Sequence, residues 1–123
     1  MGSPVPGRPT PSVAISPPKY VFRALRSTSW VQRGIINANA FRRRGPDTPH
    51  PDLEGLSVDY TYESAKSRFK KGAIRINVKK LEKLGLRIVP TGDHANIQEV
   101  PYDIPGNESD VLKWAEAIIT CCS

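Results

Sequence analysis

Short runs of alternating apolar and polar residues in the first half of the chain predict β-strands. In the first run, Val21, Arg23 and Leu25 share one face, and the aromatic side chains point the other way. The Arg33-Gly34 pair stands between two apolar pairs and predicts a hairpin turn. The expected strands cover residues 19–25, 30–31, 35–36 and 55–59.

Apolar residues spaced three and four positions apart predict three helices, each preceded by a residue that can cap its first turn. The spacing is clearest near the C-terminus, where Val111, Ala115 and Ile118 fall on one face. Gly72 is expected to end the first helix, because glycine readily adopts the left-handed conformation. The N-caps of the three helices are expected to be Thr61, Asn77 and Asn107.

The segments between these elements complete the predicted order. Asn37 is expected to cap a short helical turn over residues 38–43. Further strands are expected at 73–76, 86–89 and 94–100, with Pro90 closing the second, and residues 45–51 and 101–106 are expected to be loops. This order predicts an α+β domain, in which a small mixed sheet is packed by about three helices.

The N-terminal segment differs in composition from the rest of the chain. Residues 1–18 hold six of the twelve prolines and few apolar side chains. Such a segment buries too little surface to offset its ordering entropy, so a disordered or extended leader is expected. Residues 19–123 have the length of a single domain.

The same sequence gives an expectation for compartment. No apolar run is long enough to cross a bilayer, and the N-terminus lacks the apolar region of a signal peptide. The two cysteines are adjacent, at Cys121-Cys122, where disulfide geometry is strained. A cytoplasmic, reducing environment with no membrane partner is therefore expected.

Charged residues are grouped along the chain, whose formal net charge is +6. Bases dominate residues 1–46 and 66–87, and acids dominate residues 47–65 and 88–123. Such blocks can fold into one positive surface, which favours a nucleic acid or an acidic protein as partner. The residues expected to form that surface are Arg42, Arg43, Arg44, Lys66, Arg68, Lys70, Lys71, Lys79, Lys80 and Lys83.

Candidate catalytic residues are few. His94 stands at the start of a strand beside Asp93, and imidazole titrates near neutral pH. Arg23 and Glu99 are the groups expected to act with it if the protein is an enzyme. The sequence contains no glycine-rich phosphate loop, no nucleophile elbow and no metal-ligand spacing, so neither a cofactor nor a metal is expected.

Several short landmarks follow one another along residues 19–100. They are Tyr20-Val21-Phe22-Arg23, Trp30, Ala40-Phe41, Gly55-Leu56-Ser57-Val58, Leu84-Gly85-Leu86 and His94-Ala95-Asn96-Ile97. In this order they resemble a pattern found in short bacterial proteins that have no established activity. The resemblance covers about two-thirds of the chain. It implies one coherent domain and assigns no chemistry.

These observations lead to three hypotheses. The first is a non-enzymatic binding module that engages a nucleic acid or an acidic protein through its basic surface. The second is a small nucleotide- or nucleic-acid-directed enzyme, a toxin-like effector, in which His94, Arg23 and Glu99 converge on one pocket. The third is a subunit of a larger assembly that folds its leader onto a partner. The arrangement of the side chains in space separates the first two.

Overall fold

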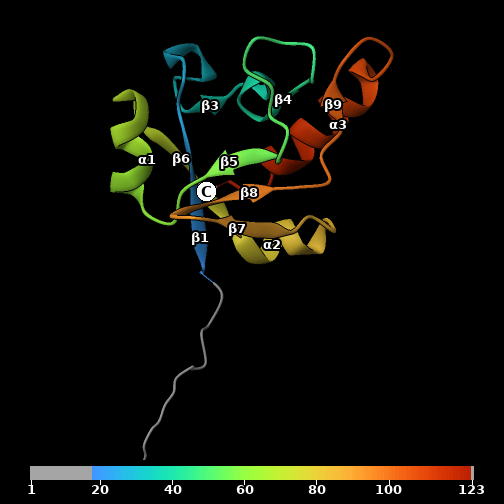
Figure 1. The fold of residues 1–123 in the computed structure, drawn as a ribbon. Coiled ribbons are helices and arrows are strands. Elements are labelled where there is room, and N and C mark those ends of the chain that lie inside the picture. The colour runs from blue at the N-terminus through green and yellow to red at the C-terminus, as the bar shows by residue number, and fades with distance from the viewer. Residues whose placement is uncertain (1–17, 123) are drawn as a thin grey trace, which may run out of the picture.

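The computed structural model describes residues 18–122, so nearly all of the expected leader, residues 1–17, lies outside the described residues. The predicted α+β class is confirmed, because three α-helices pack around several small sheets (Figure 1). No helix within residues 18–122 combines the length and the apolar composition that a membrane crossing requires.

Two antiparallel sheets form the centre of the molecule. Strand β1 (Tyr20–Ala24) pairs with β6 (Ala73–Asn77). Strands β5 (Leu56–Val58), β8 (His94–Ile97) and β7 (Ile88–Thr91) form the second sheet in the order β5-β8-β7. In Figure 1, β1 runs through the middle of the fold, and its direction crosses that of the strands in the second sheet.

A reciprocal pair of backbone hydrogen bonds joins the two sheets. The amide of Phe22 donates to the carbonyl of Asp59, and the amide of Asp59 donates back to Phe22, both at 2.8 Å. Strand β1 is therefore held beside β5. This contact brings Arg23, the next residue of β1, close to Ser57 of β5.

Short elements follow β1 and form one wall of the molecule. The predicted hairpin is confirmed, with Val31 opposite Ile36 in its register. The predicted cap is also present, since Asn37 Oδ1 accepts a hydrogen bond from the Asn39 amide at 2.9 Å. The elements are η1 (Thr28–Trp30), β2 (Val31–Gln32), β3 (Ile35–Ile36) and η2 (Ala38–Phe41).

Two of the sequence expectations are wrong where β4 (Arg43–Arg44) pairs in parallel with β9 (Tyr102–Asp103). The helical turn expected through residue 43 ends at the buried Phe41, and residues 102–103 form a strand where a loop was expected. Pairing between segments some sixty residues apart leaves no local pattern in the sequence, which explains both errors.

Helix α1 (Tyr62–Phe69) begins as predicted, because the Thr61 hydroxyl accepts from the Ser64 amide at 3.1 Å. It ends earlier than expected. Lys70 adopts the left-handed conformation, with φ of 58°, and its amide bonds to the carbonyl of Lys66. Gly72 lies beyond this cap, in the turn that leads into β6.

Helix α2 (Val78–Lys83) has the expected cap, in which Asn77 Oδ1 accepts from the Lys80 amide at 3.0 Å. Helix α3 (Glu108–Ile119) covers the expected segment with Asn107 at the expected N-cap position, but the Asn107 side chain makes no cap hydrogen bond. The Asn107 side chain donates instead to the carbonyl of Tyr102 at 3.1 Å and so fixes the helix to β9.

Strand β7 also differs from its predicted range of 86–89. It begins at Ile88 and continues through Pro90, where a break was expected. Pro90 is tolerated because β7 is an edge strand, so the missing N–H interrupts no second ladder. Leu86, which was expected in this strand, packs in the core with 1% of its surface exposed.

A single hydrophobic core joins these elements. Its fully buried members come from η2, both sheets, α2 and α3, and the stripe predicted for α3 is confirmed by the burial of Val111, Ala115 and Ile118. Three polar residues are also buried, namely Arg23, Asp59 and Asn96. Arg23 lies where the core meets η2, because its side chain bonds to the carbonyl of Ala40.

Candidate anion-binding site

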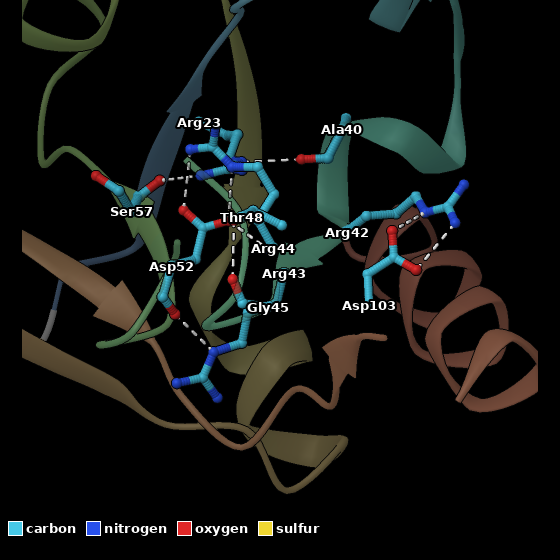
Figure 2. A network of polar contacts seen from close by, with 10 residues as sticks. All are labelled: Arg23, Ala40, Arg42, Arg43, Arg44, Gly45, Thr48, Asp52, Ser57 and Asp103. Atoms are coloured by element: carbon cyan, nitrogen blue, oxygen red, sulfur yellow. Dashed lines mark hydrogen bonds and ion pairs between the residues drawn. The ribbon is translucent and has the colours of Figure 1, made fainter. Parts of the chain in front are cut away.

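Arg23 shares a face of β1 with Val21, as the alternation of that strand predicted, and this face proves to be the inner one, with only 5% of the surface of Arg23 exposed. Its Nε donates to the Ala40 carbonyl at 2.9 Å, and its Nη1 donates to the Ser57 carbonyl at 2.8 Å (Figure 2). Burial lowers the pKa of Arg23 to about 10, because the charged guanidinium has lost most of its water. Arg23 thus joins β1, β5 and η2 through one charged group.

The guanidinium of Arg23 borders a pocket of about 320 Å³ on the wall formed by η1, η2 and β4. We call it the arginine pocket. It is lined by Arg23, Arg26, Trp30, Asn39, Arg42, Arg44 and Asp103. Four of these seven residues are arginines, which makes the pocket a focus of positive charge.

The extended backbone explains why Arg42 and Arg44 reach the arginine pocket and Arg43 does not. Arg42 ends η2 in an extended conformation and leads directly into β4. Alternate side chains of an extended segment point to opposite faces, so Arg42 and Arg44 share a face. Arg42 donates to both carboxylate oxygens of Asp103, at 3.0 and 3.1 Å. Arg44 pairs in the same manner with Asp52, at 3.2 and 3.3 Å (Figure 2).

Arg43 does not line the arginine pocket, and its side chain bonds within the protein instead. Its guanidinium donates to the carbonyls of Asp52 and Leu53 at 2.8 and 2.7 Å, and to that of Val100 at 3.1 Å. It also lies over the ring of Tyr102, 4.1 Å from the centroid. These contacts fasten β4 to β9, and they leave Arg43 little capacity for a ligand.

Arg26 and Trp30 form the more accessible side of the arginine pocket. The guanidinium of Arg26 lies 5.2 Å from the centroid of the Phe69 ring in α1. Partial burial lowers the pKa of Arg26, and the nearby charge of Arg44 lowers it further. The ring of Trp30 lies 5.6 Å from the guanidinium carbon of Arg23 and presents an aromatic surface to the pocket.

The charges of the pocket do not cancel. Four guanidiniums line it, and two carboxylates, Asp103 and Asp52, pair with two of them. Among the described residues, Arg23 has only backbone carbonyls as hydrogen-bond acceptors. The pocket therefore carries a surplus of two positive charges, one of them on a nearly buried group. The carboxylate of Asp52 attracts Arg23 without a direct ion pair. A buried charge that lacks a direct ion pair is costly, and an anion that enters the pocket lowers that cost.

The basic residues expected on the first helix occupy α1 and the turn after it. Arg68 is tied to Asp59, with both hydrogen bonds at 2.7 Å, and this bonding raises the pKa of Arg68. Lys70 and Lys71 follow the helix. Their turn lies beside the end of β1, since the amide of Leu25 donates to the carbonyl of Gly72 at 3.1 Å. This end of α1 therefore borders the arginine pocket near Arg26.

The remaining expected basic residues are farther from the pocket. Lys66 lies along α1 near the ring of Tyr62, and Lys79, Lys80 and Lys83 belong to α2. Figure 1 places α1 and α2 in separate parts of the molecule. None of the lysines lines the arginine pocket. That the whole basic set acts as one binding surface stays a prediction.

The three candidate catalytic residues have different surroundings. His94 Nδ1 lies 3.3 Å from the carboxylate of its neighbour Asp93, and this contact lowers the pKa of Asp93. Glu99 pairs with Arg87 at 3.2 Å, with both side chains largely exposed. The pocket that contains Arg23 includes neither His94 nor Glu99. The described part of the chain thus does not bring these three side chains together.

The two thiols are in protected positions at the end of α3. Cys121 is buried and Cys122 is half-buried, and both are free. Burial raises the pKa of Cys121, and it raises that of Cys122 to about 12. Both groups are therefore neutral thiols at physiological pH, which makes them weak nucleophiles. Across residues 18–122, no cluster of three or more His, Cys, Asp or Glu side chains has the arrangement of a metal site.

Of the residues that line the pocket, Arg42 and Arg44 were expected to bind a partner and Arg23 was a catalytic candidate, whereas no site role was expected for Arg26, Trp30, Asn39 and Asp103. The sequence around Asp103 gives no sign of a role in the pocket, because Asp103 reaches Arg42 only through the parallel pairing of β4 with β9. No family model, no curated protein and no solved structure was found to match the chain. The resemblance to short bacterial proteins stays a prediction, and the function rests on the geometry alone.

Proposed function

We propose that this protein is a non-enzymatic binding module that engages single-stranded nucleic acid and holds a phosphate group in the arginine pocket. The observation that carries the proposal is that four arginine residues line one cavity beside the indole side chain of Trp30. The excess positive charge there is the physical basis of affinity, and the ring supplies a stacking surface.

The chemistry of the pocket favours a nucleic acid over an acidic protein. Guanidinium groups form paired hydrogen bonds with phosphate as well as with carboxylate, so charge alone does not separate the two partners. The ring of Trp30 distinguishes the two partners. A base next to the bound phosphate can stack on this ring, whereas an aspartate or glutamate side chain has no ring. An acidic peptide is therefore the competing outcome of the test.

A continuation of the binding surface is available at the end of α1. Arg26 lies over Phe69, the last residue of α1, and Lys70 and Lys71 follow at once. A strand that leaves the pocket past Arg26 meets these two lysines. They were among the residues expected to bind phosphate, and each such contact adds affinity through release of counterions.

The proposal is tested by titrating a fluorescently labelled single-stranded oligonucleotide with the full chain and following its anisotropy. We expect the logarithm of the binding constant to fall linearly with the logarithm of the salt concentration, by about 0.7 for each phosphate neutralised. A flat salt dependence, or equal binding of a polyglutamate peptide in competition, contradicts the proposal.

The pocket itself is tested with Arg26→Gln. Arg26 is exposed and forms no ion pair within residues 18–122, so this change leaves the fold intact. We expect binding to weaken roughly tenfold, the effect of losing one charge-assisted contact. The matched control is Arg87→Gln, which removes the same charge from an exposed side chain paired with Glu99 outside the pocket. Equal losses in both variants contradict a role for the pocket.

A further inference from the structure

We infer that the arginine pocket recognises a terminal phosphate monoester of a nucleic acid strand, rather than a phosphodiester within it. This inference rests on the proposed function and names the part of the ligand that the pocket takes. Its starting observation is that the pocket gathers its charges around a single cavity of about 320 Å³. Repeated phosphates of a continuous strand call for a groove that follows the backbone instead.

The position of Arg23 is the first argument. Its guanidinium is almost fully buried, so a group that reaches it must enter the pocket. An internal phosphodiester has substituents on two of its four oxygens, and its chain leaves in two directions. A terminal monoester has three unsubstituted oxygens and one substituent. Only the monoester can present three unsubstituted oxygens to the pocket, one for each of Arg23, Arg26 and Arg44.

The charge of the pocket is the second argument. Four guanidiniums against Asp103 and Asp52 leave a surplus of two positive charges. A phosphate monoester carries about −1.5 to −2 charges at pH 7, whereas an internal diester carries only one. The monoester therefore neutralises the surplus, and the diester leaves part of it uncompensated beside the buried Arg23.

The size and the walls of the pocket are the third argument. A volume of about 320 Å³ lies at the lower end of what small-molecule sites provide, which suits one nucleotide. The ring of Trp30 lies beside Arg23, so the base of that nucleotide can stack there while its phosphate reaches the guanidiniums. Arg26 lies over Phe69, and Lys70 and Lys71 follow Phe69 in the chain, so the rest of the strand can continue past Arg26 toward these lysines.

The experiment compares three oligonucleotides of one sequence, with hydroxyl groups at both ends, with a 5′-phosphate, or with a 3′-phosphate. Each is an unlabelled competitor against one labelled strand at fixed salt. We expect one of the phosphorylated strands to compete at least about tenfold better than the hydroxyl-ended strand, since it gains further charge-assisted pairs. Whichever phosphorylated strand competes better, the 5′ or the 3′, identifies the end of the strand that enters the pocket.

Variants separate the pocket from general charge attraction. Arg26→Gln is expected to remove most of the advantage of the terminal phosphate. The double variant Lys70→Gln, Lys71→Gln is expected to weaken all three strands by a similar factor and to keep that advantage. Equal competition by all three strands overturns the inference and leaves the proposed function standing. Failure of every strand to bind overturns the proposed function, and this inference with it.

Discussion

Asp103 accepts two hydrogen bonds from Arg42 at the edge of the arginine pocket, from Nε at 3.0 Å and from Nη2 at 3.1 Å. The pocket thus already contains one anionic group, supplied by β9 of the same chain. An incoming phosphate meets the negative charge of Asp103 and competes with it for Arg42. Because both side chains are partly exposed, this pair is open to exchange with solvent and ligand.

The first prediction concerns Asp103→Asn, which removes the negative charge and keeps the shape of the side chain. We expect affinity for an oligonucleotide to rise about fivefold, because a partly exposed charge contact is worth about 1 kcal/mol. Glu99→Gln is the control, since it changes the net charge by the same amount at an exposed pair outside the pocket. The measurement is the anisotropy titration at moderate salt. Unchanged affinity in the Asp103 variant contradicts competition for Arg42.

The second prediction concerns the ion pair of Arg68 with Asp59, whose carboxylate is 1% exposed. Among residues 18–122, Arg68→Gln leaves that buried carboxylate with Ser64 Oγ, at 3.4 Å, as its remaining side-chain hydrogen-bond partner. We expect the free energy of unfolding to fall by about 2 to 3 kcal/mol, somewhat less than for a wholly buried pair because Arg68 reaches solvent. Urea denaturation measures the loss. Arg87→Gln, at an exposed pair, is expected to cost less than about 1 kcal/mol. Similar losses in the two variants contradict the prediction.

The third prediction concerns Gly55, which has φ of 119° and packs against β8. A methyl group added there meets the backbone carbonyl of Ile97, which is held in the sheet. Gly34 in the hairpin turn also has positive φ, at 76°, but has open space around its Cα. Gly34→Ala is expected to cost about 1 kcal/mol of conformational strain, and Gly55→Ala more than about 2 kcal/mol because a steric clash is added. Thermal unfolding of both variants checks the difference.

The fourth prediction concerns the pH dependence of stability. Burial raises the pKa of Cys122 from 9.0 to about 12, so the folded state holds this proton more tightly than the unfolded chain does. The contribution is fully present below pH 9.0 and is lost as the pH rises toward 12. We expect the stability of the native chain to fall more steeply over this range than that of Cys122→Ser. Parallel curves for the two proteins contradict the assigned pKa shift.

Local chemistry explains which parts of the fold could be predicted. The α3 stripe of Val111, Ala115 and Ile118 and the caps at Thr61 and Asn77 depend on residues only a few positions apart, and all are present. The β4–β9 pair depends on segments some sixty residues apart, so the chain near either strand contains no sign of it.

The candidate site was predictable only in part for the same reason. The alternation of β1 placed Arg23 with Val21 and Leu25, yet it did not reveal which face of the strand lies inward. The helical turn was expected to continue through Arg43. The chain is instead extended from Arg42 through β4, so Arg42 and Arg44 line the pocket and Arg43 fastens β9. The position of Asp103 required the fold itself.

The single charged group of Arg23 links three segments, through the carbonyls of Ala40 and Ser57, and it also borders the pocket. A compound that binds in the pocket stabilises the hydrogen bonds by which Arg23 holds β1, β5 and η2 together. Occupancy must then raise the melting temperature in proportion to the logarithm of ligand concentration, once the site is near saturation. The melting temperature measured with each of a panel of unlabelled nucleotides therefore ranks these ligands without any assay of activity.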